Sequence, residues 1–164
     1  SSDLEFFLYH ESYEDALGRG YHRLRPHSAF AEDYNIQATT RDEPVIGALR
    51  KALIEAGVPV EFSKGEAGAG QHEINIGYAN AIEMADRNLV YKTAAKEIAA
   101  QMDRSISFMA KPNFSDVGSS CHVHVSLWSA NGSEPLFADD NDRHGMSKLF
   151  RHFLAGQVAT AREF

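Results

Sequence analysis

Carboxylates and imidazoles occur at alternating positions in several short segments of the sequence. In residues 3–9 (DLEFFLY), Asp3 and Glu5 alternate with leucine and phenylalanine. Because successive side chains of a β-strand point to opposite faces, residues two apart share a face. Each segment of this kind has one apolar face and one face that carries acids or histidines. The same alternation groups Glu61 with Ser63, Glu73 with Asn75, and His122 with His124 and Ser126.

These polar faces carry carboxylates with hardly any positive partner, because Lys64, near a strand end, is the one basic residue among them. Carboxylates brought together without a cation repel each other and raise each other's pKa. Oxygen ligands combined with one or two imidazoles suit Mg²⁺ or Mn²⁺ better than Zn²⁺. The pattern therefore indicates a divalent-metal site on one face of a sheet. The spacing also allows a plainer interpretation, in which the polar faces simply contact water.

A glycine-rich segment, residues 66–73 (EAGAGQHE), is the more specific signal. It places Glu66 and Glu73 seven residues apart on either side of a turn. Glycine lets the backbone fold tightly, so both carboxylates could reach one ion. The alternative is an ordinary hairpin turn. The pair His122 and His124 is a weak signal alone, since such pairs also arise by accident.

Periodicity predicts the elements that position these side chains. Residues 43–56 have apolar positions at helical spacing, with Asp42 or Thr40 as the N-cap and Pro44 in the first turn. Residues 80–103 carry a longer apolar stripe and predict a second helix. A third helix is expected at 144–164, strands at 3–9, 59–64, 72–78, 106–110 and 121–128, a turn or loop at 10–20, and irregular structure at 21–41.

The order of these elements is strand, helix, two strands, helix, two strands, helix. Several connections are too short for parallel crossovers, so neighbouring strands are expected to be antiparallel. This predicts an α+β fold, with a mainly antiparallel sheet and flanking helices.

Composition limits the class of protein. The 164 residues suit one ordinary domain, and 43% hydrophobic with 24% charged residues is typical of a globular chain. A net charge of −7 argues against non-specific binding to nucleic acid or to anionic membranes. No apolar run approaches the roughly 20 residues of a membrane-spanning helix. With Cys121 as the single cysteine, no internal disulfide is possible and a cytoplasmic setting is expected.

The two ends of the chain suggest a piece of something longer. The sequence starts with SSDLEFFLYH, which has neither an initiator methionine nor the features of a signal peptide and already resembles a strand. It stops inside an expected helix. We therefore expect residues 1–164 to be part of a larger domain, truncated at both ends.

Four ordered motifs carry a family resemblance: residues 3–9 (DLEFFLY), 66–74 (EAGAGQHEI), 111–127 (KPNFSDVGSSCHVHVSL) and 131–137 (NGSEPLF). In this order they resemble the catalytic domain of the glutamine synthetase family, and the match spans essentially the whole chain. The resemblance implies a curved, mainly antiparallel half-barrel sheet, of which this chain would supply the N-terminal part.

The resemblance also implies roles for the polar residues. Glu5, Glu66 and Glu73 would hold the metal next to the glutamate site. Asp3 and His122 would hold the metal that bridges the ATP phosphates.

The remaining motif positions imply contacts with substrates. His124 would be the catalytic residue near the transferring phosphoryl group. Ser126 and Glu61 match nucleotide-contacting positions, and Tyr78 would lie beside the adenine. Gly118 falls in the loop that holds the amino-acid substrate.

The implied reaction is an ATP-dependent ligation. ATP phosphorylates the γ-carboxylate of glutamate, and ammonia or another amine then displaces phosphate to form an amide. Two Mg²⁺ or Mn²⁺ ions, ATP, glutamate, the amine and a ring-shaped homo-oligomer are what the resemblance implies for the intact protein. Because further substrate-binding residues of the family lie outside this chain, the chain alone is expected to be inactive.

Three departures from the family pattern concern the acceptor. Asp3 stands where ammonia-using members usually have Glu, Val117 where they have Asn, and Ser120 where they have Gly. An altered substrate loop with most metal ligands kept suggests an acceptor other than ammonia, as in glutamate–polyamine ligases. Neutral variation of the loop is the alternative interpretation.

Two other functions are consistent with parts of the sequence. A cupin-like metal oxygenase could use His122 and His124 with a carboxylate, but the long helices argue against it. A synthetase-like domain kept for assembly or regulation would be expected to lose its ligands, whereas all except Asp3 match.

Overall fold

The structure is a computed structural model that describes residues 2–163 of the chain. The chain divides into two compact units, residues 1–123 and 124–164. The described part of the first unit contains a five-stranded sheet and four helices, and that of the second contains one helix among turns and loops.

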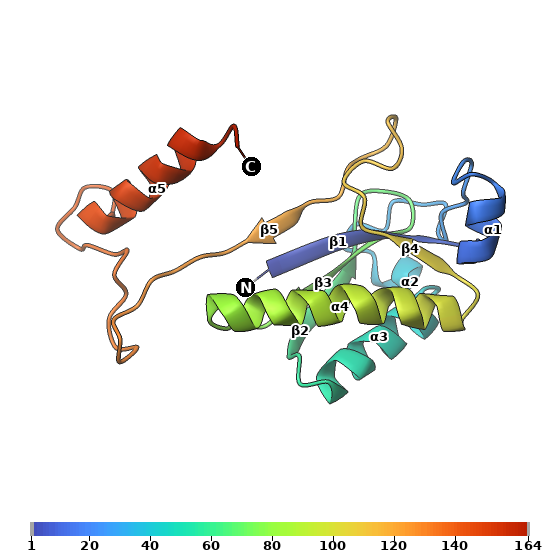
Figure 1. Cartoon of the computed structure of the whole chain (residues 1–164), viewed down its shortest axis with the longest axis horizontal. Helices are drawn as coiled ribbons and strands as arrows, with labels where there is room; N and C mark the ends of the chain where they lie inside the picture. The colour runs from blue at the N-terminus through green and yellow to red at the C-terminus, as the bar shows by residue number, and fades with distance from the viewer. Residues whose placement is uncertain (1, 164) are drawn as a thin grey trace. The chain divides into compact units, whose positions relative to one another are not determined.

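Strand β1 (Ser2–Tyr9) is the centre of the sheet in the first unit (Figure 1). One of its edges pairs along its length with β3, which in turn pairs with β2. Its other edge is shared, with β5 on residues 2–4 and β4 on residues 7–9. All four pairings are antiparallel, which confirms the predicted α+β arrangement. The partner strands are β2 (Val60–Gly65), β3 (Gln71–Ile76), β4 (Ser105–Ser107) and β5 (Cys121–Val123).

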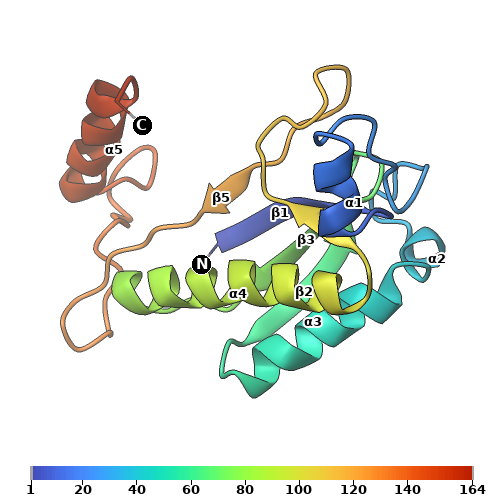
Figure 2. The same cartoon turned by 45° about the vertical axis from the view of Figure 1, so that its right-hand side comes forward.

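Helices α3 (Glu43–Glu55) and α4 (Ala81–Gln101) lie side by side against one face of this sheet, as Figures 1 and 2 show. Alternate residues of β1 and β3 point into the layer between sheet and helices. The Tyr91 hydroxyl of α4 donates to the Leu4 carbonyl of β1 at 3.1 Å. The core includes Leu4, Phe6, Leu8, Leu49, Leu53, Ile74, Ile76, Tyr91 and Ala95.

Two short helices lie in segments that were predicted to lack regular structure, so those predictions were wrong. Helix α1 (Tyr13–Gly18) begins after Ser12, whose hydroxyl accepts from the Asp15 amide. Helix α2 (Ile36–Thr39) begins after Asn35, whose side chain accepts from the Ala38 amide. Local N-caps therefore nucleate helix in both places without a long apolar stripe.

The strands predicted at 106–110 and 121–128 are shorter in the structure. Strand β4 ends at Ser107, opposite Phe7, because β5 takes residues 2–4 of the same edge of β1, from Cys121 opposite Leu4 to Val123 opposite Ser2. The predicted stripe of helix 80–103 is also only partly buried, since Ile82 and Leu89 are exposed.

The second unit contains helix α5 (Lys148–Thr160). It begins at residue 148 rather than near 144, because the Ser147 hydroxyl caps it by accepting from the Phe150 amide. The Phe137 ring packs on the Phe150 and Phe153 rings at centroid distances of 4.7 and 5.1 Å.

Within the described residues, every helix is too short or too polar to cross a lipid bilayer.

Neighbouring residues of α3 test the layer between sheet and helices. Leu53 is fully buried and Ile54 is 59% exposed. We expect Leu53→Ala to lower the free energy of unfolding by about 2–5 kcal/mol, because it leaves a cavity in a packed core. Ile54→Ala, the matched control, should change it by less than about 1 kcal/mol. Urea denaturation followed by circular dichroism measures both, and equal effects would contradict the packing described.

Candidate functional site

The face of the sheet opposite α3 and α4 carries the acids that the sequence grouped together. Glu5 of β1 lies directly across from Glu73 of β3, and Asp3 lies across from His122 of β5. Residues paired in this way in an antiparallel ladder share a face. Glu5, Glu73 and His122 each offer a ligand atom within 4.8 Å of the others, so this part of the predicted site does come together.

Burial makes this group costly without a cation. Glu5 and Glu73 are buried, whereas His122 is exposed. Burial first, and then the nearby carboxylates of Glu66, Asp3 and Glu5, raise the pKa of Glu73, and Lys64 opposes them. Two buried carboxylates and an imidazole at such separations fit a divalent ion.

Glu5 is held in place by the loop that precedes β5. The Ser120 amide and hydroxyl donate to its two carboxylate oxygens at 2.9 and 2.6 Å. The side-chain amide of Gln71 donates to the Glu5 carboxylate at 3.0 Å and to the Gly118 carbonyl at 3.0 Å. The loop around Gly118 is thus tied directly to a candidate metal ligand. The sequence indicated Ser120 only as a departure from the family pattern. The role of Gln71 was missed, although Gln71 lies on the polar face two residues before Glu73.

Lys64 lies among the acids and not merely at a strand end. It pairs across the ladder with Glu73, and its ammonium contacts the Glu66 carboxylate and lies 3.6 Å from a Glu73 oxygen. Hydrogen bonding to Glu66 and the charges of both acids raise the pKa of Lys64, although burial opposes this. Lys64 therefore joins Glu66 to Glu73 in this structure, at the place where the sequence predicted a shared metal ion.

Glu61 is placed differently from the prediction. The ladder slips between Val60 and Phe62, which leaves Glu61 as an extra residue. Phe62 consequently joins the polar face opposite Asn75, and Glu61 lines a shallow hollow beside residues of α3. Its predicted position on the carboxylate face was wrong, because a bulge breaks strict alternation.

The predicted nucleotide contacts Tyr78 and Ser126 and the predicted catalytic residue His124 lie outside the cluster of Glu5, Glu73 and His122 as the structure describes it. Tyr78 follows β3 and is 83% exposed. His124 and Ser126 belong to the second unit, where the Ser126 hydroxyl accepts from the Trp128 indole at 3.0 Å. Their predicted roles stay predictions.

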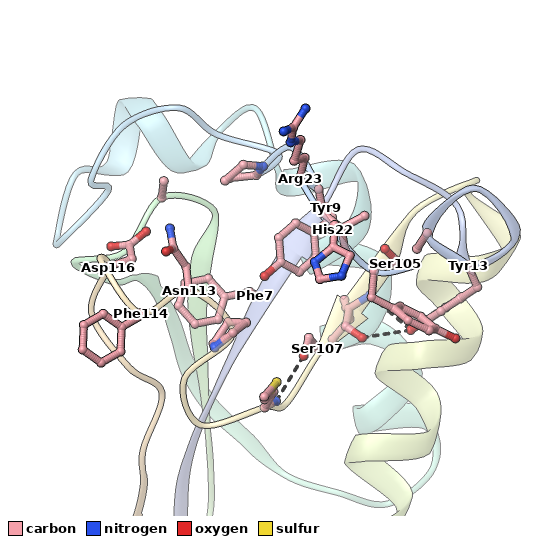
Figure 3. Close-up of a pocket in the computed structure, with 18 residues that line it drawn as sticks. Phe7, Tyr9, Tyr13, His22, Arg23, Ser105, Ser107, Asn113, Phe114 and Asp116 are labelled. Carbon is pink, nitrogen blue, oxygen red and sulfur yellow. Dashed lines mark hydrogen bonds between the residues drawn. The ribbon is translucent and has the colours of Figure 1, made fainter. Parts of the chain in front are cut away.

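A cleft of about 580 Å³ continues the same face beyond Glu5 (Figure 3). Phe7 and Tyr9, the next residues on this side of β1, form part of its wall, and Asp116 lies across from them. Desolvation and the Asp116 charge raise the pKa of Tyr9. Aromatic rings also come from Tyr13, Tyr21 and Phe114. Arg23 also lines this cleft, so its walls combine aromatic rings with one carboxylate and one guanidinium, which suits a ligand with an apolar part and polar groups.

Removing one carboxylate tests the metal-ligand assignment. We expect Glu73→Gln in the full-length protein to weaken Mn²⁺ binding by at least roughly tenfold, because a buried ligand is lost. Glu97→Gln, exposed on α4, is the control and should change nothing. Isothermal titration calorimetry measures both variants, and unchanged affinity in Glu73→Gln would contradict the assignment.

The raised pKa of Glu73 adds a pH dependence. A carboxyl whose folded pKa is raised favours the fold below its unfolded pKa, and this contribution is lost as the pH rises through the folded pKa. Protons and metal therefore compete, so Mn²⁺ affinity should fall as the pH drops through that pKa. Calorimetry across this pH range should show that Mn²⁺ affinity depends less on pH in Glu73→Gln than in the wild type. Identical pH profiles would show that protonation of Glu73 is not the cause.

The position of Lys64 gives a prediction of opposite sign. A cation bound between Glu66 and Glu73 must approach or displace the ammonium. We expect Lys64→Met to strengthen Mn²⁺ binding roughly tenfold by removing a positive charge. Lys96→Met on the exposed side of α4 is the control. Weaker Mn²⁺ binding in Lys64→Met, again by calorimetry, would show that the lysine organises the acids instead of competing.

Comparison with known proteins adds independent evidence. The sequence pattern of the glutamine synthetase catalytic domain matches residues 1–164. The γ-glutamylethanolamide synthetase GlnA4 of Streptomyces coelicolor is 43% identical over 99% of this chain and 34% of its own length. The glutamate–isopropylamine ligase of a Pseudomonas species is 35% identical over 98% of this chain and 35% of its own. The chain thus spans about a third of the length of these curated relatives.

Solved structures agree with these relatives. A structure of GmaS without ligand superposes with a TM-score of 0.83 at 29% identity, covering 98% of this chain and 36% of that one. A glutamine synthase homologue superposes with a TM-score of 0.79 at 29% identity, covering 96% of this chain and 34% of that one. Together with the acidic face of the sheet, these matches show that the chain belongs to the glutamine synthetase family, as part of its catalytic domain.

Proposed function

We propose that the protein carrying this chain is an ATP-dependent ligase that joins an amine to the γ-carboxylate of glutamate through a γ-glutamyl phosphate. The observation that carries the proposal is the cluster of Glu5, Glu73 and His122, whose ligand atoms lie within 4.8 Å of one another in a member of this family. Relatives named as glutamate–amine ligases support the same reaction class.

Divalent ions fit this face because its donors are carboxylates with one imidazole. Glu5, Glu66 and Glu73 would hold an Mg²⁺ or Mn²⁺ ion near the glutamate, and Asp3 and His122 a second one near the ATP phosphates. Bound there, the ions would neutralise charge on two anionic substrates that otherwise repel each other.

The protein's own residues would orient the partners. Ser120 and Gln71 fix the Glu5 carboxylate by hydrogen bonds, and Gln71 also fixes the Gly118 carbonyl. We assign the amino-acid substrate to this loop and the phosphoryl-transfer region to His124. Ser126, Glu61 and Tyr78 remain proposed contacts of the nucleotide.

We favour an alkylamine over ammonia as the acceptor. Val117 and Ser120 alter the substrate loop, and two relatives are named for ethanolamide and isopropylamine products or substrates. The cleft beyond Glu5 supports this choice, since its aromatic rings suit the carbon chain that an alkylamine has and ammonia lacks.

The remaining assignments concern the whole protein. We propose that residues 1–164 are the N-terminal part of a catalytic domain and that the rest of the site comes from other segments. We further propose a ring-shaped homo-oligomer, as the family resemblance implies, and a cytoplasmic setting, which the single cysteine favours.

An acceptor panel tests the function. The full-length protein is mixed with Mg-ATP, glutamate and either ammonia, ethanolamine, isopropylamine or putrescine, and phosphate release and amide product are measured. We expect turnover with at least one alkylamine exceeding that with ammonia. Turnover with ammonia but with none of the alkylamines would refute the proposed alkylamine acceptor. No turnover with any amine would favour a non-catalytic domain.

Variants separate chemistry from folding in this assay. Glu66→Ala and Glu73→Ala should each lower turnover by at least about a hundredfold, because charge neutralisation is lost at the reacting groups. Glu97→Ala should retain full turnover. The isolated 164 residues should show none, and activity of this piece would contradict the proposed role of the missing segments.

A further inference from the structure

A second group of ionisable side chains lies on the opposite side of the sheet from the acidic face. His72 precedes Glu73 on β3, so its side chain points into the core, where its ring lies 6.0 Å from the Phe6 ring. Glu32 and Asp42 contact it there. Their exposed fractions are 0% for Glu32 and Asp42 and 1% for His72.

The three side chains converge on one point. The His72 Nε2 atom is 2.5 Å from Asp42 Oδ2 and 3.7 Å from Glu32 Oε2. One ligand atom from each residue lies within 4.8 Å of the other two. Asp42 heads α3 but makes no side-chain cap there, because its carboxylate contacts His72 and His27 instead. Asp42 is thus the N-cap residue of α3, one of the two predicted, but its side chain does not bond to the backbone of the first turn.

Glu32 is the unexplained member of this group. Both of its carboxylate oxygens are buried and neither has a hydrogen-bond partner. A buried carboxylate without partners is strongly unfavourable unless a cation or a proton neutralises it.

The backbone keeps the Glu32 carboxylate at this place. The Glu32 amide donates to the Glu66 carbonyl at 3.2 Å, and Asp33 forms a bridge with Gly65. A Cβ added to Gly65 would come within 2.5 Å of the Glu32 Cβ, so the two backbones approach too closely for any other residue there. The carboxylate is thus directed at His72 by a packed and hydrogen-bonded segment.

We propose that Glu32, Asp42 and His72 form a structural binding site for one transition-metal dication, with Zn²⁺ as the best fit. A dication balances two carboxylates beside a neutral imidazole. Zn²⁺ takes imidazole nitrogen and carboxylate oxygen at about 2.0–2.2 Å, which places tetrahedral ligands roughly 3.3–3.5 Å apart. The 3.7 Å separation of Glu32 and His72 is slightly wider than this, so it would close on binding, and the 2.5 Å His72–Asp42 pair would open. Mg²⁺ usually keeps several bound waters, so the burial of all three side chains disfavours it here, whereas His122 on the acidic face is exposed.

His27 completes the arrangement from outside. Its Nδ1 atom contacts Asp42 Oδ1, so that Asp42 Oδ2 is directed at His72. Partners of this kind orient metal ligands in proteins. The site would fix β3, the start of α3 and the segment of Glu32 to one another, immediately behind Glu66 and Glu73. It is independent of whether the protein is a ligase.

Metal analysis of the full-length protein tests the site. The protein is loaded with Zn²⁺, passed through a desalting column in excess Mg²⁺ to clear the acidic face, and analysed by mass spectrometry of the elements. We expect about one Zn²⁺ per chain to remain. Less than about a tenth of that amount would overturn the proposal and leave a proton shared between His72 and the acids as the explanation.

Two matched variants locate the ion. Glu32→Gln keeps the size of the side chain and should lose the retained Zn²⁺, whereas Glu73→Gln on the other face should keep it. The reverse result would place the ion among the acids of the opposite face and overturn the proposal. X-ray absorption of the loaded wild type should show nitrogen and oxygen ligands with one imidazole, and sulfur ligation would also overturn it.

Thermal unfolding distinguishes loss of the metal site in Glu32→Gln from misfolding of this variant. Removal of Zn²⁺ with a chelator should lower the Tm of the wild type and leave the Tm of Glu32→Gln unchanged. If the two respond equally, the ion does not bind at Glu32. Ligase activity is measured separately, so failure of the acceptor panel would not affect this result.

Discussion

The alternation of side chains along β1 is the constraint on which both the core and the site depend. Leu4, Phe6 and Leu8 are buried against α3 and α4, while Asp3 and Glu5 lie on the opposite face. Because both edges of this strand are hydrogen-bonded to neighbours, its register cannot slip by one residue without exchanging the two faces. Burial of the apolar face therefore provides the force that holds the carboxylates close together in spite of their repulsion.

That repulsion explains why positively charged or hydrogen-bonding side chains contact the acids on both faces of this sheet. On the acidic face, the Lys64 ammonium lies between Glu66 and Glu73, and in the core His72 and His27 enclose Asp42. Each positive or polar partner offsets part of the cost of grouping acids in a poorly hydrated place. Membership of the glutamine synthetase family also removes the cupin-like interpretation, since the histidines here accompany a helix-backed open sheet.

Much of this arrangement could be predicted from the sequence because periodicity records burial. Period-two alternation identified β1 and β3, helical spacing identified α3 and α4, and the shared face of Glu5 and Glu73 followed. The sequence could not show the bulge after Val60, which moves Glu61 away from the acids. It also could not show that the Asp42 side chain bonds to His72 instead of to the first turn of α3, because that contact joins residues 30 positions apart.

The two ends of the loop that contains Gly118 both rest on one edge of β1. β4 leaves that edge at Phe7 and β5 rejoins it at Leu4, and the Glu5 amide between them donates to the Ser120 carbonyl at 3.3 Å. Within the loop, the Ser119 amide closes onto the Ala110 carbonyl at 2.8 Å. Its tip can therefore diversify while its base stays attached to the strand that carries the acids. If the proposed function holds, substitutions in this loop would alter the fit of the amine without moving the strand that carries the candidate metal ligands.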